Sequence, residues 1–257
     1  MVELIRSTIP PIHPGGRPIV LGAAAATLAG RLLLRTLGLR RAGRLVTTVG
    51  LTATAGSAAF FRAPTRVRPE GGGLVVAPAD GLVSLITDAP PPPELGLDPT
   101  PLVRVSIFLS IFDVHVQRVP IDGVIRQVAY RPGAFLSADL DKASDDNERN
   151  SLLIDPTDPT VGGPVVVTQI AGLVARRIVC DVRAGQRVAT GDTYGLIRFG
   201  SRLDTYLPPG TRPLVRLGQR AVGGETVLAD LTGTAGGAGT AGTAGIAGDG
   251  ATAGGGG

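Results

Sequence analysis

Apolar residues are arranged in two different ways along this chain. Near the N-terminus they form two long runs, residues 19–30 and 45–61. The segment between these runs contains five arginines: Arg31, Arg35, Arg40, Arg41 and Arg44. The second run lies at the lower limit for a membrane span, and the first reaches a comparable length only if Arg31 and residues 32–34 are included. The two runs predict a membrane-associated helical hairpin that crosses the bilayer or dips into one leaflet. Two ordinary core helices are the alternative.

After residue 73 the pattern changes to short apolar runs separated by turn residues, which is typical of β-strands. We expect strands at residues 74–76, 83–86, 103–110, 114–119, 123–130, 165–170 and 173–182. A content of 38 Gly and 21 Pro also favours strands and turns over long helices. The predicted fold class is mainly β (α+β): a flattened β-barrel or sandwich preceded by the N-terminal helical hairpin.

The same pattern divides the chain into four parts. A basic and apolar region at residues 1–63 is followed by a linker at residues 64–73 and by the main folded domain at residues 74–230. Residues 231–257 are mostly Gly, Ala and Thr, so they bury too little apolar surface to offset the entropy of ordering. We predict that they form a disordered tail.

Charge is also unevenly distributed. Residues 1–70 carry ten arginines against Glu3 and Glu70, a net charge of +8, whereas the remainder has a net charge of −4. Because these arginines lie among apolar runs, an anionic membrane surface is a better partner than nucleic acid. The positive-inside tendency favours a cytoplasmic arginine-rich loop. We therefore expect a protein of the cell membrane, peripheral or anchored by the hairpin, on the cytoplasmic face.

Scarce residue types exclude several kinds of chemistry. Lys142 is the only lysine and lies in an acidic loop, which disfavours a pyridoxal phosphate enzyme or a lipoyl or biotinyl carrier. Cys180 is the only cysteine, so an intrachain disulfide and a cysteine-based metal site are excluded. An imidazole base must be His13 or His115. The acidic stretch 139–148 lacks the glycine of an EF-hand loop, and no metal site is predicted.

Three short motifs place a reactive side chain inside apolar sequence. They are Ala77-Pro78-Ala79-Asp80-Gly81, Phe112-Asp113-Val114-His115-Val116-Gln117-Arg118-Val119-Pro120, and Arg198-Phe199-Gly200-Ser201-Arg202. Asp80, His115 and Ser201 supply an acid, a base and a nucleophile, the set that a serine-type acyl transfer requires. On these residues alone, a serine hydrolase acting on an external ester and a purely structural histidine both stay open.

In this order the motifs resemble the phosphatidylserine decarboxylase family across residues 74–230. Its active centre combines a Pro-x-Asp-Gly turn, a Val-His-Val strand followed by Arg-x-Pro, and a Gly-Ser cleavage motif; residues 131–135 and 147–149 are also similar to family segments. Two positions depart from the pattern. Arg202 stands where the family commonly has Thr, and Phe112 stands where some members have a further histidine, whose role cannot be carried over.

The resemblance implies a proenzyme that cuts itself between Gly200 and Ser201. His115, oriented by Asp80, would take the proton from the Ser201 hydroxyl, which attacks the carbonyl carbon of Gly200. Ser201 would end as a covalent pyruvoyl group, the only cofactor that the resemblance implies.

The implied enzyme is a lyase (carboxy-lyase) of phospholipid biosynthesis. Its pyruvoyl carbonyl at position 201 would form a Schiff base with phosphatidylserine and promote decarboxylation to phosphatidylethanolamine. The implied partners are this phospholipid, the membrane surface, and the two subunits of one precursor, residues 1–200 and 201–257. Nucleic acid is not expected, and a homo-oligomer is left open.

Two further alternatives stay open. The same pyruvoyl chemistry on another serine-headed lipid would leave an identical sequence pattern. In addition, residues 182–197 resemble the half-barrel motif of lipoyl, biotinyl and sugar-phosphotransferase carrier domains. That segment has no lysine at its tip, and only His115 is available to take a phosphoryl group, so a carrier domain is the weaker interpretation.

Overall fold

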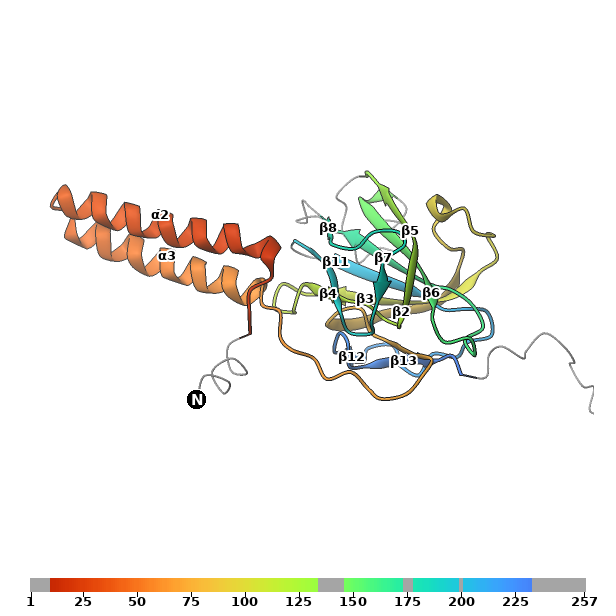
Figure 1. The fold of residues 1–257 in the computed structure, drawn as a ribbon. Helices are drawn as coiled ribbons and strands as arrows, with labels where there is room; N and C mark the ends of the chain where they lie inside the picture. Colours follow the sequence, from red (N-terminus) through yellow and green to blue (C-terminus); the bar gives the residue numbers. More distant parts are fainter. Residues whose placement is uncertain (1–9, 134–145, 173–177, 199–200, 233–257) are drawn as a thin grey trace, which may run out of the picture.

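The computed structural model describes residues 10–133, 146–172, 178–198 and 201–232. Within these ranges the chain forms a helical hairpin that projects from a mainly β body (Figure 1). The predicted fold class is therefore confirmed.

The hairpin consists of the 3-10 turn η1 (Pro14–Gly16) and two α-helices, α2 (Arg17–Thr36) and α3 (Arg40–Phe60). The helices pack closely because small residues face each other. A Cβ atom at Gly50 would lie 2.1 Å from Thr27 Oγ1, and one at Gly30 would lie 3.2 Å from the side chain of Val46.

Most of the hairpin surface is exposed. Among the described helices, only the stretch Pro14–Thr36 is long and apolar enough to cross a membrane, a test of length and composition that signal sequences and core helices also pass. Only 6% of the most apolar part of this stretch is buried, and in α3 only Gly43 and Phe60 are buried. The alternative of two ordinary core helices is therefore wrong. An exposed apolar hairpin supports membrane association.

The body contains thirteen strands in the described residues. They are β1 (Leu74–Val76), β2 (Gly81–Ala89), β3 (Leu102–Leu109), β4 (Val116–Arg118), β5 (Gly123–Arg131), β6 (Arg149–Pro156), β7 (Val165–Ala171), β8 (Ile178–Cys180), β9 (Arg187–Val188), β10 (Thr193–Ile197), β11 (Ser201–Tyr206), β12 (Arg220–Ala221) and β13 (Val227–Asp230). A second 3-10 turn, η2 (Pro93–Leu95), lies between β2 and β3.

The strands form three antiparallel sheets. Eight of them make one curled sheet in the order β12-β2-β3-β11-β7-β6-β5-β9, and the others make the small sheets β4-β10-β8 and β1-β13. The main apolar core includes Ile107 of β3, Val167 of β7 and Leu203 of β11, all with 0% exposure. Side chains alternate along a strand, so Arg202 and Asp204 lie on the opposite face of the sheet from Leu203.

The structure differs from the predicted body in its strands and in where the packed chain ends. Strands β6 and β9 to β13 were not predicted, although the residues of β6 and β11 are buried for most or all of their length. At the C-terminus, Leu231 is fully buried and Thr232 forms a β-bridge with Val161, so the packed chain continues just past Asp230. The rest of the tail predicted to be disordered lies outside the described residues, as does part of the strand predicted at residues 173–182.

Candidate active site

His115 occupies the connection between β3 and β4, and a tight turn before it fixes its backbone. Asp113 accepts hydrogen bonds from the backbone N and the Oγ atom of Ser110, both at 2.8 Å, and its other oxygen is paired with Arg220. Burial disfavours the charged carboxylate, but the Ser110 hydrogen bonds and the Arg220 guanidinium outweigh it and lower the pKa of Asp113.

The imidazole ring of His115 is buried, with 1% exposure. Its Nδ1 atom lies 2.9 Å from the carbonyl oxygen of Asp113, and the ring stacks on Phe60 of α3 with centroids 4.0 Å apart. Burial lowers the pKa of His115 to about 4; interactions with Asp113 raise it only partly, and the charge of Arg62 lowers it further.

These contacts determine which ring nitrogen is available. At neutral pH the His115 ring is uncharged, and Nδ1 must carry the hydrogen because the neighbouring carbonyl oxygen of Asp113 can only accept. The lone pair is therefore on Nε2. This atom is buried and has no hydrogen-bond partner among the described residues, as expected for a base that awaits a proton donor.

Ser201 is the first residue of β11, in the middle of the eight-stranded sheet. It pairs with Leu109 of β3 on one side and with Ala171 of β7 on the other, and its exposure is 0%. Within the described part of the chain its Oγ atom also has no hydrogen-bond partner. Since β3 leads directly into the turn that carries His115, the two unpartnered polar atoms belong to the same end of the sheet.

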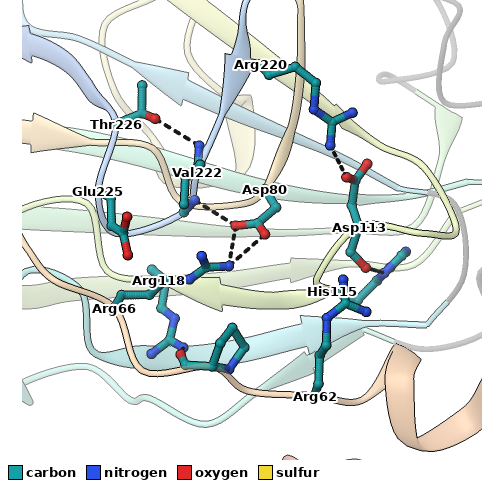
Figure 2. A network of polar contacts seen from close by, with 12 residues as sticks. Arg62, Arg66, Asp80, Asp113, His115, Arg118, Arg220, Val222, Glu225 and Thr226 are labelled. Atoms are coloured by element: carbon teal, nitrogen blue, oxygen red, sulfur yellow. Dashed lines mark hydrogen bonds and ion pairs between the residues drawn. The ribbon is translucent and has the colours of Figure 1, made fainter. Parts of the chain in front are cut away.

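Asp80 lies in the turn between β1 and β2, but its contacts differ from the predicted ones. Its carboxylate accepts hydrogen bonds from Arg66 at 2.8 and 2.6 Å and from the backbone N of Gly223 at 2.8 Å. The predicted orienting contact of Asp80 with His115 is therefore absent from the described structure, where the Asp113 carbonyl oxygen fills that role (Figure 2). A charge-assisted pair with Arg66 outcompetes a neutral imidazole for the carboxylate.

The first residues of the predicted linker, 64–66, are bound to the body. Besides the Arg66–Asp80 pair, the guanidinium of Arg118 donates to the backbone oxygen of Pro64 at 2.6 Å and to Thr193 at 3.0 Å. Arg118 belongs to the histidine motif, so its position was visible in the sequence but its partners were not. Long-range contacts of this kind have no local periodicity by which they could be found.

The base of the hairpin also packs against the site. Phe60 and Phe61 form an apolar cluster with Leu196 of β10, the strand that leads toward the cleavage motif. A guanidinium nitrogen of Arg198 lies 3.3 Å from the backbone oxygen of Gly15. The hairpin thus contacts both the histidine and the segment before Ser201. Gly200 and Phe199 lie outside the described residues.

His13, the other histidine, lies at the same base but is engaged in packing. Its Nδ1 atom accepts a hydrogen bond from the backbone N of Gly15 at 3.1 Å, and its Nε2 atom lies 3.3 Å from a carboxylate oxygen of Asp181. Burial lowers its pKa despite the nearby Asp181. Both ring nitrogens of His13 have partners, so within the described ranges His115 is the histidine that has a ring nitrogen without a partner.

The described residues contain no cluster of three or more His, Cys, Asp or Glu side chains that would hold a metal ion. Three acidic residues of the stretch 139–148, Asp139, Asp141 and Asp145, lie outside the described residues. Glu148 accepts a hydrogen bond from Tyr130 at 3.0 Å. A pyruvoyl group needs no ligand set of this kind, because it would form from Ser201 itself.

Comparisons with known proteins agree with this site. The family model described as phosphatidylserine decarboxylase matches residues 55–229. A phosphatidylserine decarboxylase proenzyme of Mycobacterium marinum is 57% identical over 231 residues, covering 90% of this chain and 91% of the relative. Proenzymes of the same name from Saccharopolyspora erythraea and Mycobacterium leprae are 57% and 55% identical, each over 90% of this chain and 93% of the relative. The chain belongs to the phosphatidylserine decarboxylase family.

Proposed function

We propose that this chain is a phosphatidylserine decarboxylase proenzyme that cleaves its own Gly200–Ser201 bond and then converts phosphatidylserine to phosphatidylethanolamine. One observation carries the proposal: at the family's cleavage motif, the Oγ atom of Ser201 is buried and has no hydrogen-bond partner among the described residues, and the same is true of the Nε2 atom of His115. Two such atoms at one end of a sheet are costly unless they have a chemical role.

Self-cleavage begins with His115 as the general base. Its ring is neutral at physiological pH because its pKa is about 4, and the Asp113 carbonyl oxygen holds the hydrogen on Nδ1. Nε2 accepts the Ser201 hydroxyl proton while Oγ bonds to the carbonyl carbon of Gly200, whose bond to the Ser201 nitrogen breaks. An ester replaces the peptide bond.

The ester is then broken by an elimination at Ser201. Removal of the Cα proton of Ser201 breaks the bond between Cβ and Oγ, and the Gly200 carboxylate leaves as the new end of the larger chain. The resulting C=C–N group takes a proton on Cβ and becomes an imine, and water then adds to the imine carbon, so that the nitrogen departs as ammonia and a methyl ketone is left. His115 is the candidate to hold and return these protons, and Asp80 binds Arg66 and the backbone N of Gly223.

The residues around Ser201 fit a group that must stay in place after the chain is cut. The pyruvoyl group supplies a carbonyl that condenses with the substrate amine and takes up the electron pair released with carbon dioxide. Strand β11 would hold it, because Ser201 to Tyr206 are paired with β3 on one side and with β7 on the other. The same ladders join the smaller subunit, 201–257, to the larger one.

The substrate assignment depends on the membrane hairpin. Its exposed apolar surface and its arginines would hold the body at an anionic bilayer, so a long-chain lipid need not be extracted into water. Phe60 at the hairpin base contacts His115, which supports delivery of a lipid headgroup from the bilayer side. The proposed enzyme is thus a lyase of the cell membrane, and the positive-inside tendency of the arginines favours its cytoplasmic face.

Intact-mass spectrometry tests the proposal. Purified wild-type protein should give two chains that divide after Gly200, the smaller one starting with a pyruvoyl group, while Ser201→Ala should stay whole. The processed protein should then release carbon dioxide from phosphatidylserine vesicles. A wild type that stays in one piece but hydrolyses esters would instead support the serine hydrolase, and cleavage with no turnover of phosphatidylserine would support another serine-headed lipid.

A further inference from the structure

The turn between α2 and α3 carries a cleft lined by arginines. A cavity of about 520 Å³ lies between the two helices there, and its lining consists of Arg31, Arg35, Arg40, Gly43, Arg44, Thr47 and Thr48. We call this feature the arginine cleft. It lies at the far end of the hairpin from the body, where Figure 1 shows the two helices joined. A helix of 20 residues such as α2 is about 30 Å long, so the cleft is separate from the active site.

The arginine cleft has no internal counter-charge. The sequence contains no Asp or Glu between Glu3 and Glu70, and in the described structure none of the four cleft arginines forms an ion pair. Four guanidinium groups around one cavity repel each other unless an anion lies among them.

Local backbone features add to the positive potential and leave room for a ligand. Helix α3 begins at Arg40 without a side-chain cap and without an acidic residue in its first turn, so the positive end of its dipole is uncompensated at the cleft. Gly43 is buried and has no side chain to fill the cavity. The hydroxyl of Thr47 donates to the Gly43 carbonyl oxygen at 2.7 Å, which leaves the guanidinium groups as the free donors.

The surroundings of the cleft indicate where the anion comes from. Six leucines near it are more than half exposed: Leu28, Leu32, Leu33, Leu37, Leu39 and Leu45. A site for a soluble anion or for nucleic acid has no use for exposed leucines, whereas at a bilayer they enter the acyl region while guanidinium groups reach the phosphates. Arginine binds phosphate oxygens in bidentate fashion.

We propose that the arginine cleft is a binding site for the phosphate of an anionic phospholipid headgroup, separate from the site that acts on substrate. The proposal does not depend on self-cleavage or decarboxylation, and the lipid in question need carry no amine. A zwitterionic headgroup is disfavoured because its cation would lie among the four arginines.

Lipid titration of the full-length protein in non-ionic detergent micelles, read by native mass spectrometry, tests this site. The ligands are phosphatidylglycerol, phosphatidylcholine and inorganic phosphate, each added alone. We expect one phosphatidylglycerol to bind most tightly. Arg40→Gln should weaken its binding about tenfold, because a charge-assisted hydrogen bond to phosphate is lost.

Arg41→Gln is the matched control. Arg41 is exposed on the same turn of α3 but does not line the cavity, and its loss changes the net charge by the same amount. We expect it to weaken binding about twofold at most, since exposed charges contribute little outside a defined site. Circular dichroism of both variants should show unchanged helix content.

Three results would overturn the proposal. Equal losses in the two variants would mean diffuse attraction to positive charge, without a site. Phosphatidylcholine binding as tight as phosphatidylglycerol binding would mean that only the leucines matter. Binding of inorganic phosphate as tight as that of phosphatidylglycerol would mean a site for free phosphate.

Discussion

Arginines in the β body and arginines in the hairpin have opposite surroundings. In the body, Arg202 is 2% exposed and forms two hydrogen bonds of 2.8 Å with Asp204, which is itself fully buried. In the hairpin, Arg44 is exposed and has no carboxylate near it in the described structure. The buried charges of Arg202 and Asp204 therefore satisfy each other inside the body, whereas the arginines and leucines at the hairpin tip are exposed. One residue type serves folding in one region and binding in the other.

The largest effect is expected in the body, at the histidine with a free nitrogen. His115→Gln keeps the side-chain volume but removes the base, so self-cleavage should slow by about 10² to 10⁴-fold. Gel analysis of precursor and fragments over time measures this rate. His13→Gln is the control because both nitrogens of His13 have structural partners, and it should still be processed. Rapid processing of His115→Gln would remove this residue from the mechanism.

The next largest effect is expected on stability, when a buried ion pair of the body is broken. Arg202→Leu leaves the buried Asp204 with Arg104, whose Nε atom is 3.9 Å away, as its remaining cationic partner, and should lower the free energy of unfolding by about 3 kcal/mol. Denaturant unfolding should be measured in the Ser201→Ala background, where the chain is expected to stay whole. If Arg202→Leu unfolds at the same denaturant concentration as its parent, Arg104 alone is enough to stabilise Asp204.

Low pH should destabilise the body through protonation of His115. The unfolded state takes up a proton on His115 near pH 6.5 and the folded state only near pH 4, so stability falls as pH decreases through this window. The expected loss is about 3 kcal/mol. Unfolding curves at several pH values test this, and the corresponding slope should be missing from His115→Gln. The cleavage rate should stay level from pH 8 down to about 5.

The hairpin base gives a smaller effect that connects the two regions. Phe60→Ala removes the ring that stacks on His115, which should expose the imidazole and raise its pKa toward the ordinary value. NMR titration of the ring protons is direct, because the chain contains only two histidines. His13 is the internal control, and an unchanged His115 titration would show that Phe60 does not control its burial.

The smallest effect is expected at the hairpin tip. Arg44→Leu should change the free energy of unfolding by less than about 0.5 kcal/mol, because an exposed arginine without a partner contributes little to stability. The measurement is the same denaturant titration as for Arg202→Leu. A loss as large as that of Arg202→Leu would contradict the contrast between the two regions.

Much of the fold was predictable because it depends on local patterns. The long apolar runs predicted α2 and α3, and the short apolar runs predicted β1 to β5, β7 and β8, whereas β6 and β9 to β13 were not predicted. Strand β6 was missed because it begins with Arg149, Asn150 and Ser151, whose polar side chains are buried by the rest of the fold and not by any pattern within the strand.

Only those residues of the site that lie in the three sequence motifs could be predicted. Ser201 and His115 are the two residues whose unpartnered atoms support the proposed chemistry. The contact expected between Asp80 and His115 was wrong because Arg66, from the linker, binds the carboxylate. The stacking of Phe60 on His115 joins segments far apart in sequence, and only the folded chain brings them together.

The central position of β11 has a consequence for the lifetime of the protein. A precursor folds as one chain, so its strands find each other within a single molecule. After the proposed cut at Ser201, the strand between β3 and β7 would belong to a second chain, and refolding would require two chains to meet again. We expect mature protein that once unfolds to be lost to aggregation or proteolysis. Its durability is then set by the rate of unfolding, and each copy has a single opportunity to fold.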